Sequence, residues 1–277
     1  MNGRTSTDAP AADGAADGGG DIAAALGRVR ADIARFAERH GRAPGSIELL
    51  AVGKTKPATA LAKAARAGQR AFGENYVDEA LAKIDALGHR TTDEAREPLS
   101  WHFIGTIQSR RCEAIAAHFD WAHGIDREKI ARRLSERRAT SLAPLDVCIQ
   151  LNLDGEASKG GVGPEGLDAL ADLCAELPGL RLRGLMTIPA PRQGIDAQRR
   201  AFAAVRERME ALRARGHDGL DTLSMGMSGD LEAAIAEGAT LVRVGTAVFG
   251  RRESKGGNGR AAGDGDGGTS RGAATGS

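Results

Sequence analysis

The sequence has no run of about eighteen consecutive apolar residues and no charged-then-apolar segment at its N-terminus. The first is needed for a membrane-spanning helix and the second for a secretory signal, so we expect a cytoplasmic protein with no membrane partner. It has only 3 cysteines, at spacings that fit no metal site. We interpret them as reduced packing residues and predict no bound metal.

An excess of charge of one sign is also missing. The chain has 38 Lys and Arg against 37 Asp and Glu, which gives a formal net charge of +1. No overall basic field would attract nucleic acid, and the arginine-rich segments 127–138 and 199–215 alternate with Glu and apolar residues as solvated helix faces do. We therefore expect no nucleic-acid partner.

Both ends of the chain lack apolar residues. Residues 1–20 are mostly Ala, Gly, Asp and Thr, and residues 253–277 are rich in Gly, Ser, Arg and Asp. Neither segment has enough apolar area to offset the entropy lost on ordering. We predict disordered tails at 1–20 and 253–277 and one folded domain over 21–252.

Within that domain, patterns typical of helices and strands alternate. An N-terminal helix is predicted over 21–40, where apolar residues recur at every third or fourth position. Eight strands are predicted at 47–52, 70–73, 99–104, 121–125, 145–153, 181–188, 222–225 and 241–249. Helices are predicted between them at 59–67, 77–87, 109–118, 127–138, 164–177, 196–215 and 230–236.

This count is that of an α/β protein of the (β/α)8 TIM-barrel type, with an extra N-terminal helix and no second domain. A doubly wound open sheet is the alternative, but no G-x-G-x-x-G follows the first strand.

In such a barrel the active site lies at the C-terminal ends of the strands. The first predicted strand ends at Lys54, after a short apolar run. A desolvated lysine amine can lose its proton and attack a carbonyl, whereas most lysines stay solvated and charged.

The last two strands precede a candidate phosphate site. Loops after these strands commonly bind phosphate in barrels. Ser228 is predicted to be the N-cap of helix 230–236, and Gly245 and Thr246 offer amides and a hydroxyl. A lysine opposite a phosphate site suits a ligand with both an aldehyde and a phosphate. Pyridoxal 5′-phosphate (PLP) fits, with Lys54 forming the Schiff base.

Seven ordered motifs strengthen this prediction. They are AVGKTKP, FGENY, WHFIG followed by Gln108, QLNLDGEASKGG, RGLMTIP, LSMGMSGD and VRVGTAVFG. Over residues 21–251 they resemble the pyridoxal phosphate homeostasis protein family, often called the YggS/PROSC family. The resemblance implies a fold-type III barrel like the N-terminal domain of alanine racemase, with PLP on Lys54. It also implies a protein that binds and manages PLP without an established catalytic activity.

The resemblance also assigns further cofactor-binding residues. It places Arg243 near the pyridine nitrogen and Asn75 and Met186 along the ring pocket, with Ser224 as an added contact. The chain departs from the family where Gln108-Ser109-Arg110-Arg111 stands in place of the usual Q-x-N-K, so no role is carried over to that loop.

We predict a non-catalytic, monomeric carrier that delivers PLP to apo PLP-dependent enzymes. Alanine racemase uses the Schiff-base lysine and a tyrosine delivered by a second domain and a dimer partner. Tyr76 is the only tyrosine here and lies in the second βα turn. His102 and His123 are alternative bases, although we interpret each as structural. The alternatives left open are a PLP-dependent amino-acid racemase or decarboxylase, and a Schiff-base aldolase acting on sugar phosphates.

Overall fold

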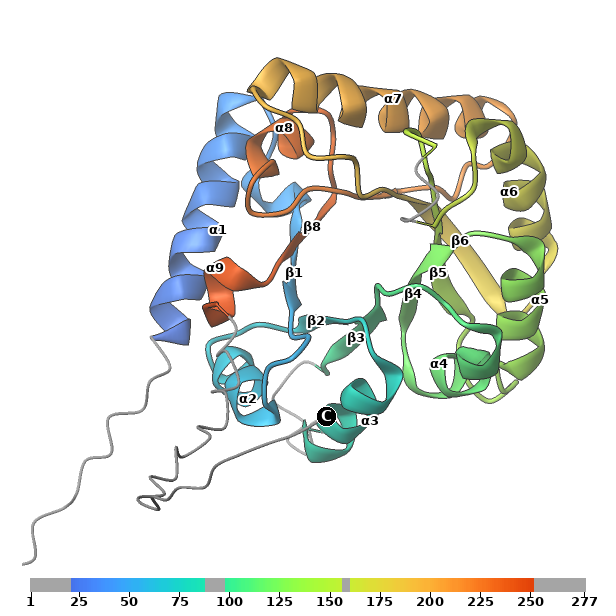
Figure 1. Cartoon of the computed structure of the whole chain (residues 1–277), viewed down its shortest axis with the longest axis horizontal. Coiled ribbons are helices and arrows are strands. Elements are labelled where there is room, and N and C mark those ends of the chain that lie inside the picture. The colour runs from blue at the N-terminus through green and yellow to red at the C-terminus, as the bar shows by residue number, and fades with distance from the viewer. Residues whose placement is uncertain (1–20, 88–97, 156–159, 252–277) are drawn as a thin grey trace, which may run out of the picture.

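The computed structural model describes residues 21–87, 98–155 and 160–251. Within these ranges eight strands form one closed barrel in the order β1 to β8, with every strand parallel to both neighbours (Figure 1). The predicted single (β/α)8 barrel is confirmed, and the described ranges contain no second domain. The tails predicted at 1–20 and 253–277 lie outside the described residues.

Strands and helices alternate along the chain, and Figure 1 shows the helices as a ring around the strands. The strands are β1 Glu48–Val52, β2 Ala71–Glu74, β3 Ser100–Phe103, β4 Trp121–Ile125, β5 Leu145–Gln150, β6 Leu180–Met186, β7 Thr222–Ser224 and β8 Leu241–Val244. The helices are α1 Ile22–Arg39, α2 Ala58–Arg66, α3 Val77–Leu87, α4 Cys112–His118, α5 Glu128–Arg137, α6 Leu167–Glu176, α7 Ile195–Ala214, α8 Leu231–Ala236 and α9 Thr246–Phe249.

Helix α1 is the extra N-terminal helix that the sequence predicts. It begins where the Asp21 carboxylate accepts hydrogen bonds from the amides of Ala23 and Ala24, both at 3.1 Å. Its apolar face is buried and packs against α2, α8 and α9 (Figure 1). Because α9 has only 4 residues, α1 supplies the covering of the barrel wall near β8 and β1.

The apolar core has an outer part between strands and helices and a small inner part inside the barrel. The inner part consists of Leu50, Val52, Ala71, Ile104 and Leu241. The polar residues His102, His123, Ser224 and Arg243 are also buried, and they come from β3, β4, β7 and β8. Burial of polar groups is unfavourable unless they are paired, so this polar part of the interior needs an explanation.

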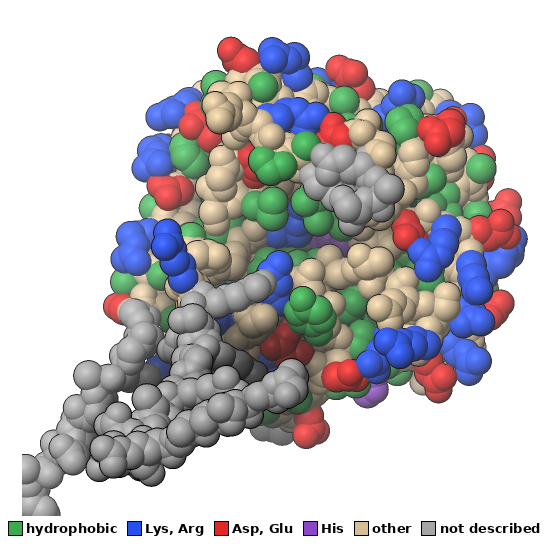
Figure 2. All heavy atoms as spheres, in the orientation of Figure 1, with side chains coloured by type: hydrophobic (Ala, Val, Ile, Leu, Met, Phe, Trp, Pro, Cys, Tyr) green, Lys and Arg blue, Asp and Glu red, His purple; other side chains and the backbone are tan. Residues whose placement is uncertain are grey.

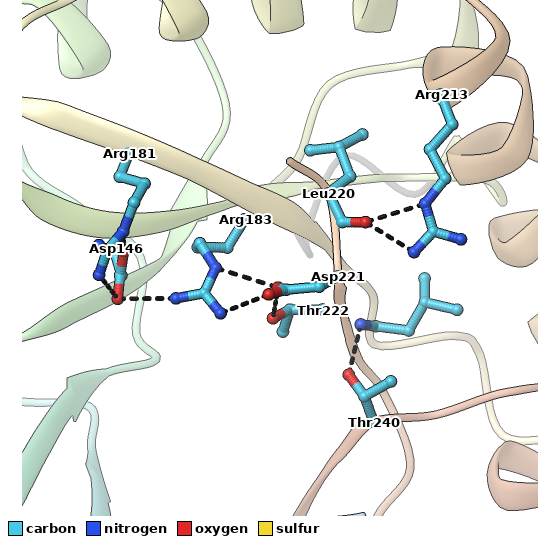
Figure 3. A network of polar contacts seen from close by, with 9 residues as sticks. Asp146, Arg181, Arg183, Arg213, Leu220, Asp221, Thr222 and Thr240 are labelled. Carbon is cyan, nitrogen blue, oxygen red and sulfur yellow. Dashed lines mark hydrogen bonds and ion pairs between the residues drawn. The ribbon is translucent and has the colours of Figure 1, made fainter. Parts of the chain in front are cut away.

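Charged residues tie together the N-terminal parts of β5, β6 and β7 (Figure 3). Arg183 lies 3.1 Å from an oxygen of Asp146 and 2.5 Å from an oxygen of Asp221, and Arg181 also pairs with Asp146. The Arg183 guanidinium also covers the ring of Trp121, 5.0 Å from its centre. This ion-pair network braces the end of the barrel opposite to the predicted site.

Some predicted boundaries are wrong. The strand predicted over 241–249 ends at Val244, because the chain leaves the sheet at Gly245 and becomes helix α9, whose Val248 is buried. The strand predicted over 145–153 ends at Gln150, where Leu151 forms an isolated bridge with a later loop. The helices predicted from 109 and from 164 each begin with a turn of 3-10 helix.

All three cysteines, Cys112, Cys148 and Cys174, are buried and unpaired, in agreement with their interpretation as packing residues. Burial raises the pKa of the Cys174 thiol to about 12, which keeps it protonated. Within the described ranges no three His, Cys, Asp or Glu side chains are grouped to hold a metal. In the same ranges no helix is long and apolar enough to cross a membrane.

Gly184 in β6 tests how closely the strands approach. A Cβ atom at this position would lie 1.8 Å from the carbonyl oxygen of Thr222 in β7. Because both atoms belong to sheet backbone, we expect Gly184→Ala to destabilise the fold by about 3 kcal/mol in urea unfolding. Gly219→Ala is the matched control, since a Cβ atom there meets nothing within 4 Å. Equal effects of the two substitutions would contradict this packing.

Candidate functional site

Lys54 lies at the C-terminal end of β1, as predicted, in a tight turn. The Gly53 carbonyl accepts a hydrogen bond from the Lys56 amide at 3.0 Å, and Thr55 between them has a φ of 64°. This conformation is unfavourable for a β-branched residue, by an amount on the order of 1–3 kcal/mol. The Lys54 side chain is half-buried, and its amine has no hydrogen bond or ion pair with the described residues. It is therefore available to a ligand.

The end of β8 lies beside this turn. β1 and β8 are paired along their length, and a Cβ atom on Gly245 would lie 3.2 Å from the carbonyl oxygen of Val52. Thr246 follows as the first residue of α9, where the first N–H groups have no acceptor within the helix. Lys54, Gly245 and Thr246 therefore share one edge of the barrel mouth.

Ser228 lies in the loop after β7, but not in the predicted role. The N-cap of α8 is Asp230, whose carboxylate accepts a hydrogen bond from the Met227 amide at 2.6 Å. The Ser228 prediction is wrong because the chain first turns at Gly226, which has a φ of 95° and packs against α8, and becomes helical only after Asp230. Ser228 remains exposed in this loop, with no hydrogen bond to any described residue.

Arg243 is only 4% exposed. One guanidinium nitrogen donates to the carbonyl and the hydroxyl of Ser224, at 2.5 and 2.8 Å, and the other donates to the Thr187 carbonyl at 2.8 Å. Burial lowers the pKa of Arg243 to about 10, so the group is still charged at neutral pH. The alternative that Arg243 is a surface charge is excluded.

Asn75 and Met186 lie at two other strand ends. Asn75 follows β2, and its buried Oδ1 has no hydrogen-bond partner in the described part of the chain. Leaving such an atom unpaired costs about 1–3 kcal/mol, which a ligand that donates to it would recover. Met186 ends β6, fully buried and outside the outer apolar core. Figure 2 looks onto this end of the barrel and shows a central hollow with basic and histidine side chains inside.

A chain of hydrogen bonds runs from Ser224 across the barrel interior. His123 Nδ1 lies 2.8 Å from the Ser224 hydroxyl, and His123 Nε2 lies 3.0 Å from His102 Nδ1. His102 Nε2 lies 2.9 Å from the Ser100 hydroxyl. Burial lowers the pKa of His102 to about 3, and burial, His102 and Arg243 together lower that of His123 well below its usual range. Both rings are therefore neutral, and neither is exposed at the mouth.

Acid is expected to destabilise the protein through these two histidines. Their pKa values are depressed in the folded state, so unfolding takes up protons below the usual histidine pKa of about 6.5. Their contribution is complete above about pH 6.5 and is lost as the pH falls towards 3, by up to about 1.4 kcal/mol per pH unit for each ring. Urea unfolding between about pH 7 and pH 5 measures this slope.

His102→Gln is expected to make that slope shallower. His118→Gln, a change at an exposed position on α4, is expected to leave it unchanged. If all three proteins had the same slope, the neutral state of His102 would be contradicted.

A buried ion pair that the sequence did not predict lies behind the Lys54 turn. Lys83 Nζ in α3 donates to Glu74 Oε1 and to the Gly53 carbonyl, both at 2.8 Å. The Lys83 and Glu74 side chains are 5% and 0% exposed. Burial raises the pKa of Glu74 to about 7, although the Lys83 ammonium opposes this. Lys83 thus fixes the peptide group that precedes Lys54.

The loop that departs from the family pattern is tied to the protein surface. Arg111 forms a two-pronged ion pair with Asp78, at 2.7 and 2.6 Å, and Arg110 donates to Gln108 at 3.0 Å. Arg111 thus connects the loop to α3, whereas Arg110 makes its contact within the loop.

Comparison with known proteins first gives the class of barrel. The family described as alanine racemase, N-terminal domain, matches residues 25–253. Alanine racemase from Corynebacterium glutamicum has the same fold, with a TM-score of 0.58 and 19% identity over 82% of this chain and 60% of the racemase chain. At this identity the likeness shows the fold alone.

More similar proteins define the family. A protein of Pseudomonas aeruginosa named pyridoxal phosphate homeostasis protein is 55% identical over 84% of this chain and 96% of its own length. The Escherichia coli K12 protein of the same name is 50% identical over 84% of this chain and 97% of its own. PipY of Synechococcus elongatus, solved with PLP bound, has a TM-score of 0.71 at 35% identity, over 82% of this chain and 99% of that chain. The chain belongs to the pyridoxal phosphate homeostasis protein family.

Proposed function

We propose that this protein binds PLP reversibly as a Schiff base on Lys54 and releases it to apo-enzymes. The observation that carries the proposal is the Lys54 amine, which is half-buried at the barrel mouth and has no partner among the described residues. The name of its relatives and the PLP-bound structure of PipY support PLP as the ligand.

The side chains around Lys54 have the donors that this ligand needs. PLP supplies an aldehyde that reacts with amines and a ring that can withdraw electrons from them. We assign the phosphate to an amide and hydroxyl cluster, because such groups bind anions without a counter-charge. The phosphate donors are Ser228, Gly245 and Thr246, and the ring contacts are Asn75, Met186, Ser224 and Arg243.

Arg243 favours storage of PLP over catalysis. A guanidinium can only donate a hydrogen bond. A pyridine nitrogen that faces Arg243 must therefore accept that bond, and it stays unprotonated. An unprotonated ring is a weak electron sink, whereas PLP enzymes that need a strong sink place a carboxylate there. The three hydrogen bonds that hold Arg243 inside the barrel support this assignment.

The described part of the site also offers no well-placed second base. His102 and His123 are buried and neutral and hydrogen-bond to each other, while Tyr76 is 57% exposed on the outside of its turn. The alternative function is an amino-acid racemase or decarboxylase. Incubation of PLP-loaded protein with a panel of amino acids tests it, and we expect neither inversion nor loss of carbon dioxide; turnover of any of them would favour the enzyme.

Transfer of PLP tests the carrier function directly. Loaded protein, freed of unbound PLP, is mixed with an apo PLP-dependent enzyme. We expect the activity of that enzyme to appear as the visible absorbance of the carrier falls. A phosphatase that destroys free PLP, added in a parallel sample, distinguishes hand-over between proteins from release into solution. If the recipient stayed inactive in both samples, the release step would be wrong.

We also propose that the protein works as a monomer in the cytoplasm. Racemases of this fold class dimerise with the help of a second domain, and the described ranges contain none. Sedimentation velocity of the PLP-loaded protein tests this, and a dimer at micromolar concentration would contradict it.

A further inference from the structure

The hydrogen-bond chain of Ser100, His102, His123 and Ser224 runs from the end of the barrel that holds the ion-pair network, its lower end, to Arg243, its upper end. At its lower end the His102 ring stacks on Trp121, with 5.3 Å between ring centres and 5° between planes. Trp121 in turn lies under the guanidinium of Arg183, which belongs to the ion-pair network. At its upper end His123 contacts the Ser224 hydroxyl, which also accepts from Arg243. One column of contacts therefore crosses the whole barrel.

Burial and the lack of a carboxylate partner among the described residues keep the two histidines of this column neutral. Arg243 lies above His123, and Arg183 lies beyond Trp121. No carboxylate within the described ranges forms an ion pair or hydrogen bond with either ring. Because both rings are buried with no anion of the described chain in contact, and Arg243 acts on His123, a protonated ring would be unfavourable at either position.

Neutral rings give the chain a direction. Arg243 can only donate, so the Ser224 oxygen must accept from it. The single hydroxyl hydrogen of Ser224 then has one acceptor among the described residues, His123 Nδ1. His123 must carry its hydrogen on Nε2 and donate it to His102 Nδ1, and His102 must donate from Nε2 to Ser100. The reverse direction would leave the Ser224 hydrogen without an acceptor.

We propose that His123 is a positioning residue that, backed by His102, fixes the Ser224 hydroxyl as an acceptor for Arg243. This fixes the orientation of the Arg243 guanidinium in the site. This inference rests on the proposed function only for the identity of the group that Arg243 meets. The column itself exists without a ligand, and the ligand-free protein can be used to test it.

The first test is the tautomer of each ring in the ligand-free protein. Two-dimensional nitrogen NMR at neutral pH distinguishes hydrogen on Nδ1, on Nε2 or on both. We expect both His102 and His123 to carry hydrogen on Nε2 alone. Hydrogen on Nδ1 or a doubly protonated ring at either position would overturn the proposal. A protein that binds no PLP would still give this result, so failure of the proposed function is distinguishable.

The second test uses two matched variants of His123. The amide oxygen of His123→Asn replaces Nδ1 and can still accept from Ser224, whereas the amide of His123→Gln replaces Nε2 and keeps only the contact with His102. We expect His123→Gln to release PLP about tenfold faster, because it loses the hydrogen bond with Ser224, the partner of the charged Arg243. The release rate of His123→Asn is expected to stay within about threefold of wild type.

The absorbance spectrum of the bound PLP against pH provides a readout that a merely structural role would not move. We expect the pH at the midpoint of this spectral change to shift in His123→Gln and to return to the wild-type value in His123→Asn. Equal release rates and equal spectra for the two variants would overturn the proposal, even if both were less stable than wild type. Should either variant fail to fold, the tautomer measurement on the wild-type protein decides.

Discussion

Lys54→Ala is expected to abolish the yellow colour that PLP gives to the protein. Without the amine no Schiff base can form, and PLP would be held only by its phosphate and ring contacts. We expect binding to weaken by roughly 100-fold, equivalent to about 2.7 kcal/mol, and the visible absorbance band to disappear. Absorbance spectra and equilibrium dialysis of loaded protein measure the two effects.

Two further variants separate chemistry from charge. Lys54→Arg keeps a positive charge at the barrel mouth but cannot form a Schiff base, so it is expected to lose the colour as well. Lys129→Ala changes an exposed lysine on α5 and is expected to keep it. A yellow Lys54→Ala protein would mean that another amine holds the aldehyde.

Lys83→Met is expected to have the largest effect on stability. It removes the counter-charge of the fully buried Glu74 and also the donor to the Gly53 carbonyl. Breaking one side of a buried ion pair typically costs about 3 to 5 kcal/mol. Urea unfolding at neutral pH measures this loss.

The effect of Lys83→Met is expected to depend on pH. Without Lys83, burial and the nearby Glu79 carboxylate act on Glu74 and both raise its pKa, so its folded pKa lies even further above the unfolded value of 4.5. A raised carboxyl pKa favours the folded state below the unfolded pKa, and this advantage is lost as the pH rises through the folded pKa. The variant should therefore differ least from wild type near pH 4.5 and most in mildly alkaline solution.

Glu74→Gln in the Lys83→Met background is the matched control. It removes the buried charge, and we expect it to restore stability at alkaline pH and to flatten the pH dependence. If the double variant were no more stable than Lys83→Met at alkaline pH, Glu74 would not be the source of the loss.

The barrel and the position of Lys54 could be predicted because both depend on local patterns. Short apolar runs separated by helical patterns indicate parallel strands, and in a barrel the end of every strand falls on one face. Lys54, Gly245 and Thr246 are close together for this reason alone. Arg243 could be placed inside the barrel because it lies between two valines in a strand.

Contacts between distant segments could not be predicted in this way. The hydrogen bond between His123 and Ser224 joins residues 101 positions apart, and its partners depend on how the barrel closes. Lys83 left a weak signal, since it shares the buried face of α3 with Val77, Ala80 and Ile84. A lysine on an apolar face indicates a buried partner, but its pairing with Glu74 became evident only from the structure.

Local chemistry was also misjudged in two places. The segment after Gly245 has the apolar composition of a strand, yet it forms α9 because the sheet has already ended at Val244. Ser228 resembles an N-cap, but Asp230 occupies the N-cap position, after the turn at Gly226. At Gly226, whose φ is 95°, the chain turns before the helix begins.

Borohydride reduction of the PLP-loaded protein, followed by mass spectrometry of its peptides, tests the central claim most directly. Reduction converts a Schiff base into a stable secondary amine and so marks the lysine that carried PLP. We predict that the label falls on the peptide containing Lys54 and that the reduced protein no longer activates an apo-enzyme. A label on another lysine with Lys54 unmodified, or no label on a protein that binds PLP, would contradict the account.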